Sequence, residues 1–373
     1  MATISSLRAL VPAVGSIPNP LDFFNSAKKK FPQYVKDGFY AQTGVEALYI
    51  YRIQRGHRSH TGLIACANVL DYVHGHIKKH ENTISAKEDK MLGLFYERNA
   101  MIKPILLTYP NAMEIDALIN RLTIALPPSF SIPFGDETHV FWEISDHQTQ
   151  EQLVDLFQNY VPNTYICDGH HRAASSERLY LSSVAQNPKH TGSEPYNFFL
   201  AAYFPISEVE VHNYNRYVQN IGMSAEQFLQ KLEPYFYVIP SLERFKPQRP
   251  HQIGMFLNRS WYRLDIKEQL LTQLKKASIK DRLDVQMLNT YVLEGVLGMK
   301  DVRTDENIQY VETPEGISGL EAKVLSSQKG AGFCMYPVAL EDLLAIANAD
   351  GTMPPKSTWI EPRMRNGFLV QTY

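Results

Sequence analysis

The sequence contains few cysteines. Cys66, Cys167 and Cys334 are spread over 373 residues, and no two of them form a CxxC pair. This spacing argues against a disulfide framework and against a structural zinc site. We therefore expect a protein of a reducing compartment, the cytoplasm.

Charge excess and long apolar runs are also lacking. The formal net charge is -2, so charge gives no basis for binding nucleic acid. The N-terminal stretch MATISSLRALVPAVGSIPNP has no basic start followed by an apolar core, and no apolar run is long enough to cross a bilayer. We expect neither a secretory signal nor a membrane partner.

Several familiar catalytic motifs are missing. The sequence has no GxxxxGK[ST], GxGxxG, HExxH or GxSxG. These absences exclude a P-loop and the other sites that these motifs mark. A phosphate-handling site must therefore be built on a different element.

Hydrophobic residues make up 44% of the chain and charged residues 20%, which suits a packed core. Strands and helices are predicted in mixed order, without strict alternation, which indicates an α+β fold with a mixed sheet and flanking helices. The expected strands are 47–53, 61–70, 103–109, 139–144, 165–167 and 196–204. The expected helices are 85–100, 111–125, 149–160, 224–235, 279–297 and one that begins near His170. Residues 1–46 show little periodicity.

The stretch YICDGHHRAASS, residues 165–176, is the most informative. It predicts a short strand, a sharp turn at Gly169 and a helix that begins near His170. The helix N-terminus, together with His170, His171 and Arg172, would present donors to an anion, most plausibly a phosphate. Asp168, just before the turn, is placed to ligate magnesium or to accept a proton. An ordinary surface helix start is the competing interpretation.

A second dense cluster is IKKHE, residues 77–81. Lys78, Lys79 and His80 could neutralise phosphate charge, and Glu81 could act as a general base or a metal ligand. A solvated charged face is the simpler interpretation. Weaker candidates are Asp301 with Arg303, Arg363 and, for substrate binding, Asn215, Arg216 and Lys356. Lys356 lies in the turn-rich MPPKSTW segment, which is either a structural loop or a binding loop.

These motifs occur in an order that resembles a known family. IKKHENT, YICDGHHRAAS, YNFFLAAYFP, HNYNR and MPPKSTW resemble the family called domain of unknown function 1015, over roughly residues 47 to 373. Members of that family usually carry an early Pro-Pro-Tyr-Asp segment, where this chain has Asn19-Pro20-Leu21-Asp22. The DGHHR element also resembles the ParB/sulfiredoxin-like superfamily, which includes the free-serine kinase.

The resemblance implies a ParB/sulfiredoxin-like domain over residues 1–216, and a smaller C-terminal α/β domain or lid over residues 217–373. It implies that Asp168 acts near the reacting hydroxyl or its magnesium, with Glu81 as second acid. Gly169, His170, His171 and Arg172 would cradle phosphate. The implied function is phosphotransfer between ATP or ADP and a small hydroxyl substrate, serine or phosphoserine, with Mg²⁺.

Two other functions fit the residues. One is a nucleotide-binding switch of the ParB type without catalysis. The other is a metal-dependent hydrolase that uses His170, His171 and nearby acids.

Overall fold

The computed structural model describes residues 1–327 and 329–373. The chain divides into two compact units. Unit 1 contains Met1–Val209 and Pro362–Tyr373, and unit 2 contains Glu210–Glu361. Among the described residues, no helix combines the length and the apolar character needed to cross a bilayer.

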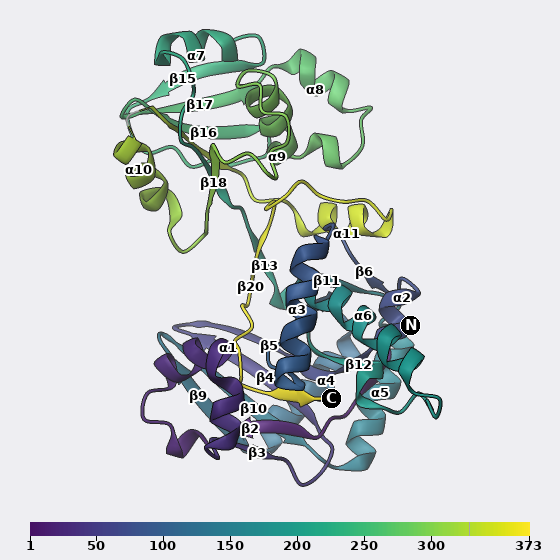
Figure 1. Ribbon diagram of the computed structural model, residues 1–373. Coiled ribbons are helices and arrows are strands. Elements are labelled where there is room, and N and C mark those ends of the chain that lie inside the picture. Colours follow the sequence, from purple (N-terminus) through teal and green to yellow (C-terminus); the bar gives the residue numbers. More distant parts are fainter. Residues whose placement is uncertain (328) are drawn as a thin grey trace. The chain divides into compact units, whose positions relative to one another are not determined.

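Unit 1 is built on a large mixed sheet (Figure 1). In spatial order its strands are β6 (Ile77–Lys78), β11 (Thr164–Asp168), β8 (Ile105–Tyr109), β12 (Phe198–Pro205), β5 (Arg58–Asn68), β4 (Leu48–Arg55), β10 (Glu137–Ile144) and β9 (Phe130–Phe134), and β1 (Ile4–Ser5) also pairs with β5. The pairs β6–β11 and β8–β12 are parallel, and the other pairs are antiparallel. Strands β8 and β12 lie in the sheet interior, and nearly all their side chains are buried. This agrees with the continuous apolar runs that predicted them.

Helices flank this sheet, as the α+β prediction required, and the prediction of a mixed sheet with flanking helices is confirmed. The helices of unit 1 are α1 (Pro20–Lys36), α2 (Val69–Val73), α3 (Ser85–Arg98), α4 (Met113–Ala125), α5 (His147–Tyr160) and α6 (His170–Gln186), with short 3₁₀ turns η1 (Val14–Ser16), η2 (Pro195–Asn197) and η3 (Ile206–Glu208). Helices α3 and α6 pack together.

A second, small sheet in unit 1 joins the two ends of the chain. Its order is β3 (Tyr40–Gln42), β2 (Ala9–Pro12), β21 (Val370–Thr372) and β7 (Ala100–Met101). The yellow strand β21 therefore lies beside the purple strand β2 (Figure 1). The last residues of the chain belong to the same unit as the first.

Unit 2 contains an antiparallel sheet with the strand order β15 (Phe236–Ser241), β17 (Ser260–Ile266), β16 (Gln252–Leu257), β19 (Ala331–Met335), β14 (Asn215–Val218) and β18 (Ile308–Val311). A separate ribbon pairs β13 (Glu210–His212) with β20 (Trp359–Glu361). The helical elements are α7 (Ala225–Leu232), α8 (Glu268–Leu274), η4 (Lys280–Arg282), α9 (Asp284–Met287), η5 (Leu288–Glu294), α10 (Gly316–Ser327) and α11 (Leu340–Asn348). Leu320 and Val324 of α10 belong, with Trp261 of β17, to the hydrophobic core of unit 2.

The unit boundary differs from the division after residue 216 that the resemblance implied. Strand β14, which contains Asn215 and Arg216, pairs with β18 and β19 of unit 2. The chain also returns to unit 1 at Pro362. Sequence position alone could not place these residues, because strand pairing joined segments far apart in the chain.

Three further helix predictions can be compared with the structure. The capping box at Ser224 and Gln227 is present at the start of α7. Helix α3 begins at Ser85 as predicted, but Ile84 is its N-cap and no side chain caps it. The predicted helix 279–297 is instead broken into η4, α9 and the π-helical η5.

Helix α1 is an element that the sequence analysis did not predict. It lies within residues 1–46, where little periodicity was seen. Its start carries a recognisable signal, because Asn19 caps the helix by accepting the N–H of Asp22, and Pro20 occupies the first turn. The segment Asn19–Asp22, which departs from the family pattern, therefore has a structural role here.

Candidate functional site: a cationic cluster at the start of helix α6

The DGHHR stretch forms the predicted strand, turn and helix. Strand β11 ends at Asp168, helix α6 begins at His170, and Gly169 between them has φ +112°. Glycine tolerates this conformation, whereas other residues are strained in it. A Cβ atom at Gly169 would also lie 2.8 Å from Nη2 of Arg172. No side chain caps the N-terminus of α6, so the positive end of its dipole is not covered by a cap.

The carboxylate of Asp168 is surrounded by cations. Its Oδ2 atom lies 3.0 Å from Nη2 of Arg172 and 3.2 Å from Nζ of Lys103. Its Oδ1 atom lies 3.9 Å from Nη1 of Arg363. We refer to Lys103, Asp168, Arg172 and Arg363 as the Asp168 cluster. Burial alone would raise the pKa of Asp168, but Arg172, Lys103 and Arg363 together hold it far below its usual range. Asp168 therefore keeps its negative charge.

Arg172 is the least accessible cation of the cluster. Its guanidinium is buried and donates hydrogen bonds to the carbonyl oxygens of Lys103 (3.2 Å) and Pro104 (2.7 Å). These bonds tie the start of α6 to the chain just before β8. Arg172 was predicted as a phosphate ligand, but its donors are directed to Asp168 and to these carbonyls. We therefore assign it to the framework of the site.

Lys103 and Arg363 are the partly accessible cations. Their side chains are 25% and 26% exposed, and Asp168 is 22% exposed. Burial lowers the pKa of Lys103 to about 8, and the charge of Asp168 opposes this shift. Below this pH the cluster carries three positive charges and one negative charge, and above it two positive charges and one negative charge. The excess can be neutralised by an anion from solution.

The two histidines of DGHHR hold the neighbouring loop. Nε2 of His170 accepts the backbone N–H of His80 at 3.4 Å, and Nε2 of His171 accepts that of Ile84 at 3.3 Å. Burial lowers the pKa of His170 well below its usual range, and it lowers that of His80 to about 4. Both rings are therefore neutral near pH 7. As acceptors of backbone N–H groups, His170 and His171 position residues 80–84.

Glu81 is the acid that this loop presents. Its Oε2 atom lies 3.7 Å from Nδ1 of the buried His170, and its side chain is 46% exposed. The structure thus brings Glu81, His80 and His170 together, so residues of IKKHE and of DGHHR are in contact. Lys79 differs, because its ammonium lies over the ring of Tyr72 at 5.6 Å. Lys78 belongs to β6 and stands opposite Tyr165 in the parallel register.

The weaker substrate-binding candidates lie together in unit 2. Arg216 is 1% exposed and donates to the carbonyl oxygens of Tyr214, Pro355 and Lys356 at 2.8–3.1 Å. Burial lowers its pKa to about 10. Nζ of Lys356 lies 5.0 Å from the ring of Tyr214, and buried Asn215 accepts a bond from Asn213. Arg216 therefore fixes the MPPKSTW segment, which acts as a structural loop at this point.

Lys103 is the site residue that the sequence analysis missed. It was expected only as the start of an apolar strand. Arg363 was a weaker candidate, and no local pattern linked it to DGHHR, because it is a single cation in a turn-rich tail. Lys103 could have been singled out as a charge at the edge of the apolar run KPILLTY.

The donor set does not form a metal centre. Within residues 1–327 and 329–373, no group of three or more His, Cys, Asp or Glu side chains is placed to hold a metal ion. The expected magnesium ligand, Asp168, instead faces three cations within 3.9 Å. A Mg²⁺ ion at this carboxylate would meet strong repulsion, so these residues do not fit it.

Comparisons with known proteins place the chain in a family. The family model described as "Protein of unknown function (DUF1015)" matches residues 7–286. No curated protein matches the chain significantly.

Solved structures resemble the chain only distantly. SbnI with a C-terminal truncation, from Staphylococcus aureus, is 14% identical, with a TM-score of 0.41 over 80% of this chain and 82% of that one. A free serine kinase in complex with AMP is 12% identical, with a TM-score of 0.36 over 82% and 90%. A conserved hypothetical protein from Pyrococcus furiosus is 11% identical, with a TM-score of 0.35 over 82% and 94%.

Proposed function

The chain belongs to the family of proteins of unknown function DUF1015, and we propose that Lys103 and Arg363 of its Asp168 cluster bind the phosphate groups of a nucleotide. We further propose that the protein transfers a phosphoryl group between this nucleotide, ATP or ADP, and a small hydroxyl substrate. Serine and phosphoserine are the first substrates to test.

The surplus of positive charge at the start of α6 carries this proposal. Lys103, Arg172 and Arg363 face one carboxylate, beside a helix N-terminus that no side chain caps. Backbone N–H groups and the helix dipole favour an anion at such an end. Lys103 and Arg363 retain exposed surface from which they can reach a phosphate oxygen.

Glu81 is the group that we assign to proton transfer. Asp168 cannot serve, because the surrounding cations keep its pKa too low for a base at neutral pH. In the forward direction the substrate hydroxyl oxygen forms a bond to phosphorus, and the bond from phosphorus to the leaving nucleotide oxygen breaks. The hydroxyl proton moves to Glu81. Positioning and charge neutralisation supply most of the catalysis in such a transfer.

A combined binding and turnover experiment tests this proposal. The affinity of the full chain for ATP and ADP is measured by calorimetry, and phosphoserine formation from ATP and serine is followed, as is the reverse reaction. We expect Arg363→Gln to weaken nucleotide binding about tenfold, the loss of one charge-assisted contact. Glu81→Gln should keep binding and lose turnover. Full turnover in Glu81→Gln contradicts the assigned role, and absence of nucleotide binding in the wild type contradicts the proposal as a whole.

One observation favours a second function, a nucleotide-binding switch without catalysis. Both carboxylate oxygens of Asp168, the acid of the DGHHR motif, are engaged by cations. A site built only to hold an anion needs no free acid. In the same experiment, nucleotide binding without any product from serine, phosphoserine or other small hydroxyl compounds would support this function.

A further inference from the structure

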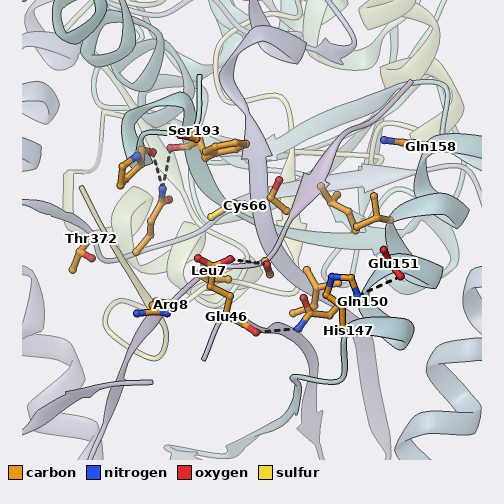
Figure 2. A pocket seen from close by; sticks show the side chains of 18 of the residues that line it. Leu7, Arg8, Glu46, Cys66, His147, Gln150, Glu151, Gln158, Ser193 and Thr372 are labelled. Carbon is orange, nitrogen blue, oxygen red and sulfur yellow. Dashed lines mark hydrogen bonds and ion pairs between the residues drawn. The ribbon is translucent and has the colours of Figure 1, made fainter. Parts of the chain in front are cut away.

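Unit 1 contains a large open cavity that shares no residue with the Asp168 cluster. Its volume is about 990 Å³, and it is bounded by β1, helix α5, the segment before β12 and strand β21 (Figure 2). Pockets that bind drug-sized molecules measure about 300–1,000 Å³. We refer to it as the α5 cavity. It is large enough for a small organic ligand.

Apolar side chains form part of the lining of the α5 cavity. Ile4, Leu7, Leu48 and Cys66 line it and are each at most 5% exposed. The sulfur of Cys66 lies near the middle of the lining residues in Figure 2. Burial raises the pKa of this thiol to about 12, so it remains protonated and serves as a small apolar contact. This lining suits the hydrocarbon part of a ligand.

Gln371 is a buried polar residue of this lining. It is 4% exposed, and its Nε2 donates to the carbonyl oxygens of Pro195 (3.3 Å) and Phe198 (3.0 Å). Its Oε1 atom is buried and has no hydrogen-bond partner among the described residues. An unsatisfied buried acceptor costs about 1–3 kcal/mol. The two donated hydrogen bonds fix the orientation of the amide. Its Oε1 atom can therefore accept a hydrogen bond from a ligand.

The rim of the cavity has an acidic surplus. Glu46, Glu151 and Asp155 line it, and Arg8 is the only lysine or arginine among its lining residues. Glu151 and Asp155 lie one turn apart on the same face of α5. Nδ1 of His147 lies 3.3 Å from Oε2 of Glu151 (Figure 2). The carboxylates outnumber the arginine, so a positively charged ligand is favoured over a negative one.

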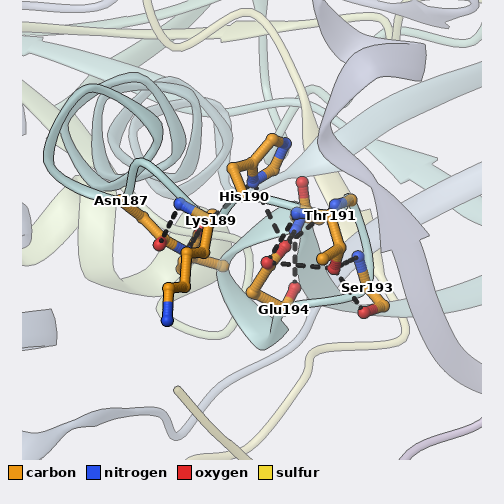
Figure 3. A network of polar contacts seen from close by, with 9 residues as sticks. Asn187, Lys189, His190, Thr191, Ser193 and Glu194 are labelled. Carbon is orange, nitrogen blue, oxygen red and sulfur yellow. Dashed lines mark hydrogen bonds and ion pairs between the residues drawn. The ribbon is translucent and has the colours of Figure 1, made fainter.

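A rigid loop forms one wall of the cavity. Glu194 accepts the backbone N–H groups of Thr191 (2.7 Å) and Gly192 (3.0 Å) and two bonds from Asn197 and the Thr191 hydroxyl (Figure 3). Desolvation opposes ionisation of this carboxylate, but these hydrogen bonds lower its pKa to about 2. The loop therefore holds Ser193 and Pro195, which line the cavity, in one arrangement before a ligand arrives.

We propose that the α5 cavity binds a small amphipathic amine. The apolar body of this ligand lies on Ile4, Leu48 and Cys66, and its ammonium group donates a hydrogen bond to Oε1 of Gln371. The carboxylates of the rim favour the positive charge. This site is separate from the proposed nucleotide site and does not depend on it.

Three probes with one hydrocarbon body test the proposal. The full chain, without nucleotide, is titrated with phenethylamine, phenethyl alcohol and hydrocinnamate, and binding is measured by ligand-observed NMR. We expect the amine to bind at least about tenfold more tightly than the alcohol, which lacks the positive charge. The carboxylate should bind most weakly. Equal affinities for all three, or no binding of the amine up to its solubility limit, would overturn the proposal.

Three variants test whether the amine binds in the α5 cavity. Val154→Trp introduces a large side chain into the cavity from the half-buried face of α5 and should abolish amine binding. Gln371→Met removes the acceptor at similar size and should weaken binding about tenfold. Val35→Trp, at a surface position of α1 that is 37% exposed, is the matched control and should bind as the wild type does. Unchanged binding in a folded Val154→Trp protein would show that the amine binds elsewhere.

Discussion

The ammonium of Lys103 lies 3.2 Å from the carboxylate of Asp168, although the two residues are far apart in the sequence. This pair joins the chain just before β8 to the end of β11. It places a lysine of lowered pKa beside an acid that cannot take up a proton at neutral pH. The chemistry of the site follows from the cations around Asp168 and not from Asp168 as a base.

The lowered pKa of Lys103 should make the proposed binding of an anion sensitive to pH. As the pH rises through about 8, Lys103 loses its proton in the ligand-free protein, and the cluster loses one positive charge. We expect the affinity for ADP to fall about tenfold between pH 7 and the pH region well above 8. Lys103→Arg, which stays protonated, should show a nearly flat profile. Calorimetric titrations across this range measure both, and an equal fall in the two proteins would contradict the assignment.

Removing the carboxylate of Asp168 should destabilise the fold. Asp168→Asn leaves Lys103, Arg172 and Arg363 without their shared counter-charge, and we expect the free energy of unfolding to fall by about 3 kcal/mol. The matched control is Asp136→Asn, which removes an exposed ion pair with Arg55. That change should have an effect of about 1 kcal/mol or less. Urea unfolding of the three proteins measures these differences.

Anions should restore part of the stability that the Asp168→Asn variant loses. Sulfate can replace the missing negative charge at the cluster, so sodium sulfate should raise the melting temperature of the variant more than that of the wild type. The same salt stabilises proteins in general, and the wild type corrects for this. Sodium chloride at equal ionic strength corrects for screening. An equal increase in both proteins would mean that the cluster has no specific affinity for anions.

Gly169 should not tolerate a side chain. Gly169→Ala places a Cβ atom at φ +112° and 2.8 Å from Nη2 of Arg172, and we expect a loss of about 1–3 kcal/mol in the free energy of unfolding. Gly93→Ala is the control, because Gly93 lies within α3 with open space at its Cβ position. There alanine should stabilise the helix by about 0.5–1 kcal/mol. Thermal unfolding followed by circular dichroism measures whether each substitution raises or lowers the free energy of unfolding. A Gly169→Ala protein as stable as the wild type would refute the packing argument.

Buried His80 should make the protein sensitive to acid. Burial lowers the pKa of His80 from 6.5 to about 4, so the folded state binds this proton less readily than the unfolded state does. The stability that this contributes is present above pH 6.5 and is lost as the pH falls towards 4. In His80→Leu the free energy of unfolding should fall less steeply in this range, by up to about 1.4 kcal/mol per pH unit. His57→Gln, in an exposed turn, should keep the wild-type slope.

The sequence predicted the secondary structure of the site better than it predicted the partners of its polar and charged side chains. The strand, turn and helix around Gly169 are encoded locally, so YICDGHHRAASS was sufficient to predict them. The roles of His170, His171 and Arg172 depend on partners at residues 80–84 and 103–104, which only the packing of α6 brings near. Arg363 reaches Asp168 because the chain re-enters unit 1 at Pro362. No local pattern records that return.

The return of residues 362–373 to unit 1 also has a consequence for the order of events during synthesis. Strand β21 pairs with β2 and β7, and Arg363 completes the cations around Asp168. While a ribosome is still translating unit 2, the earlier part of unit 1 has left the exit tunnel but lacks these partners. Domains generally fold as units during translation. Unit 1 therefore stays incomplete until all of unit 2 has been synthesised, and only then can Arg363 reach Asp168.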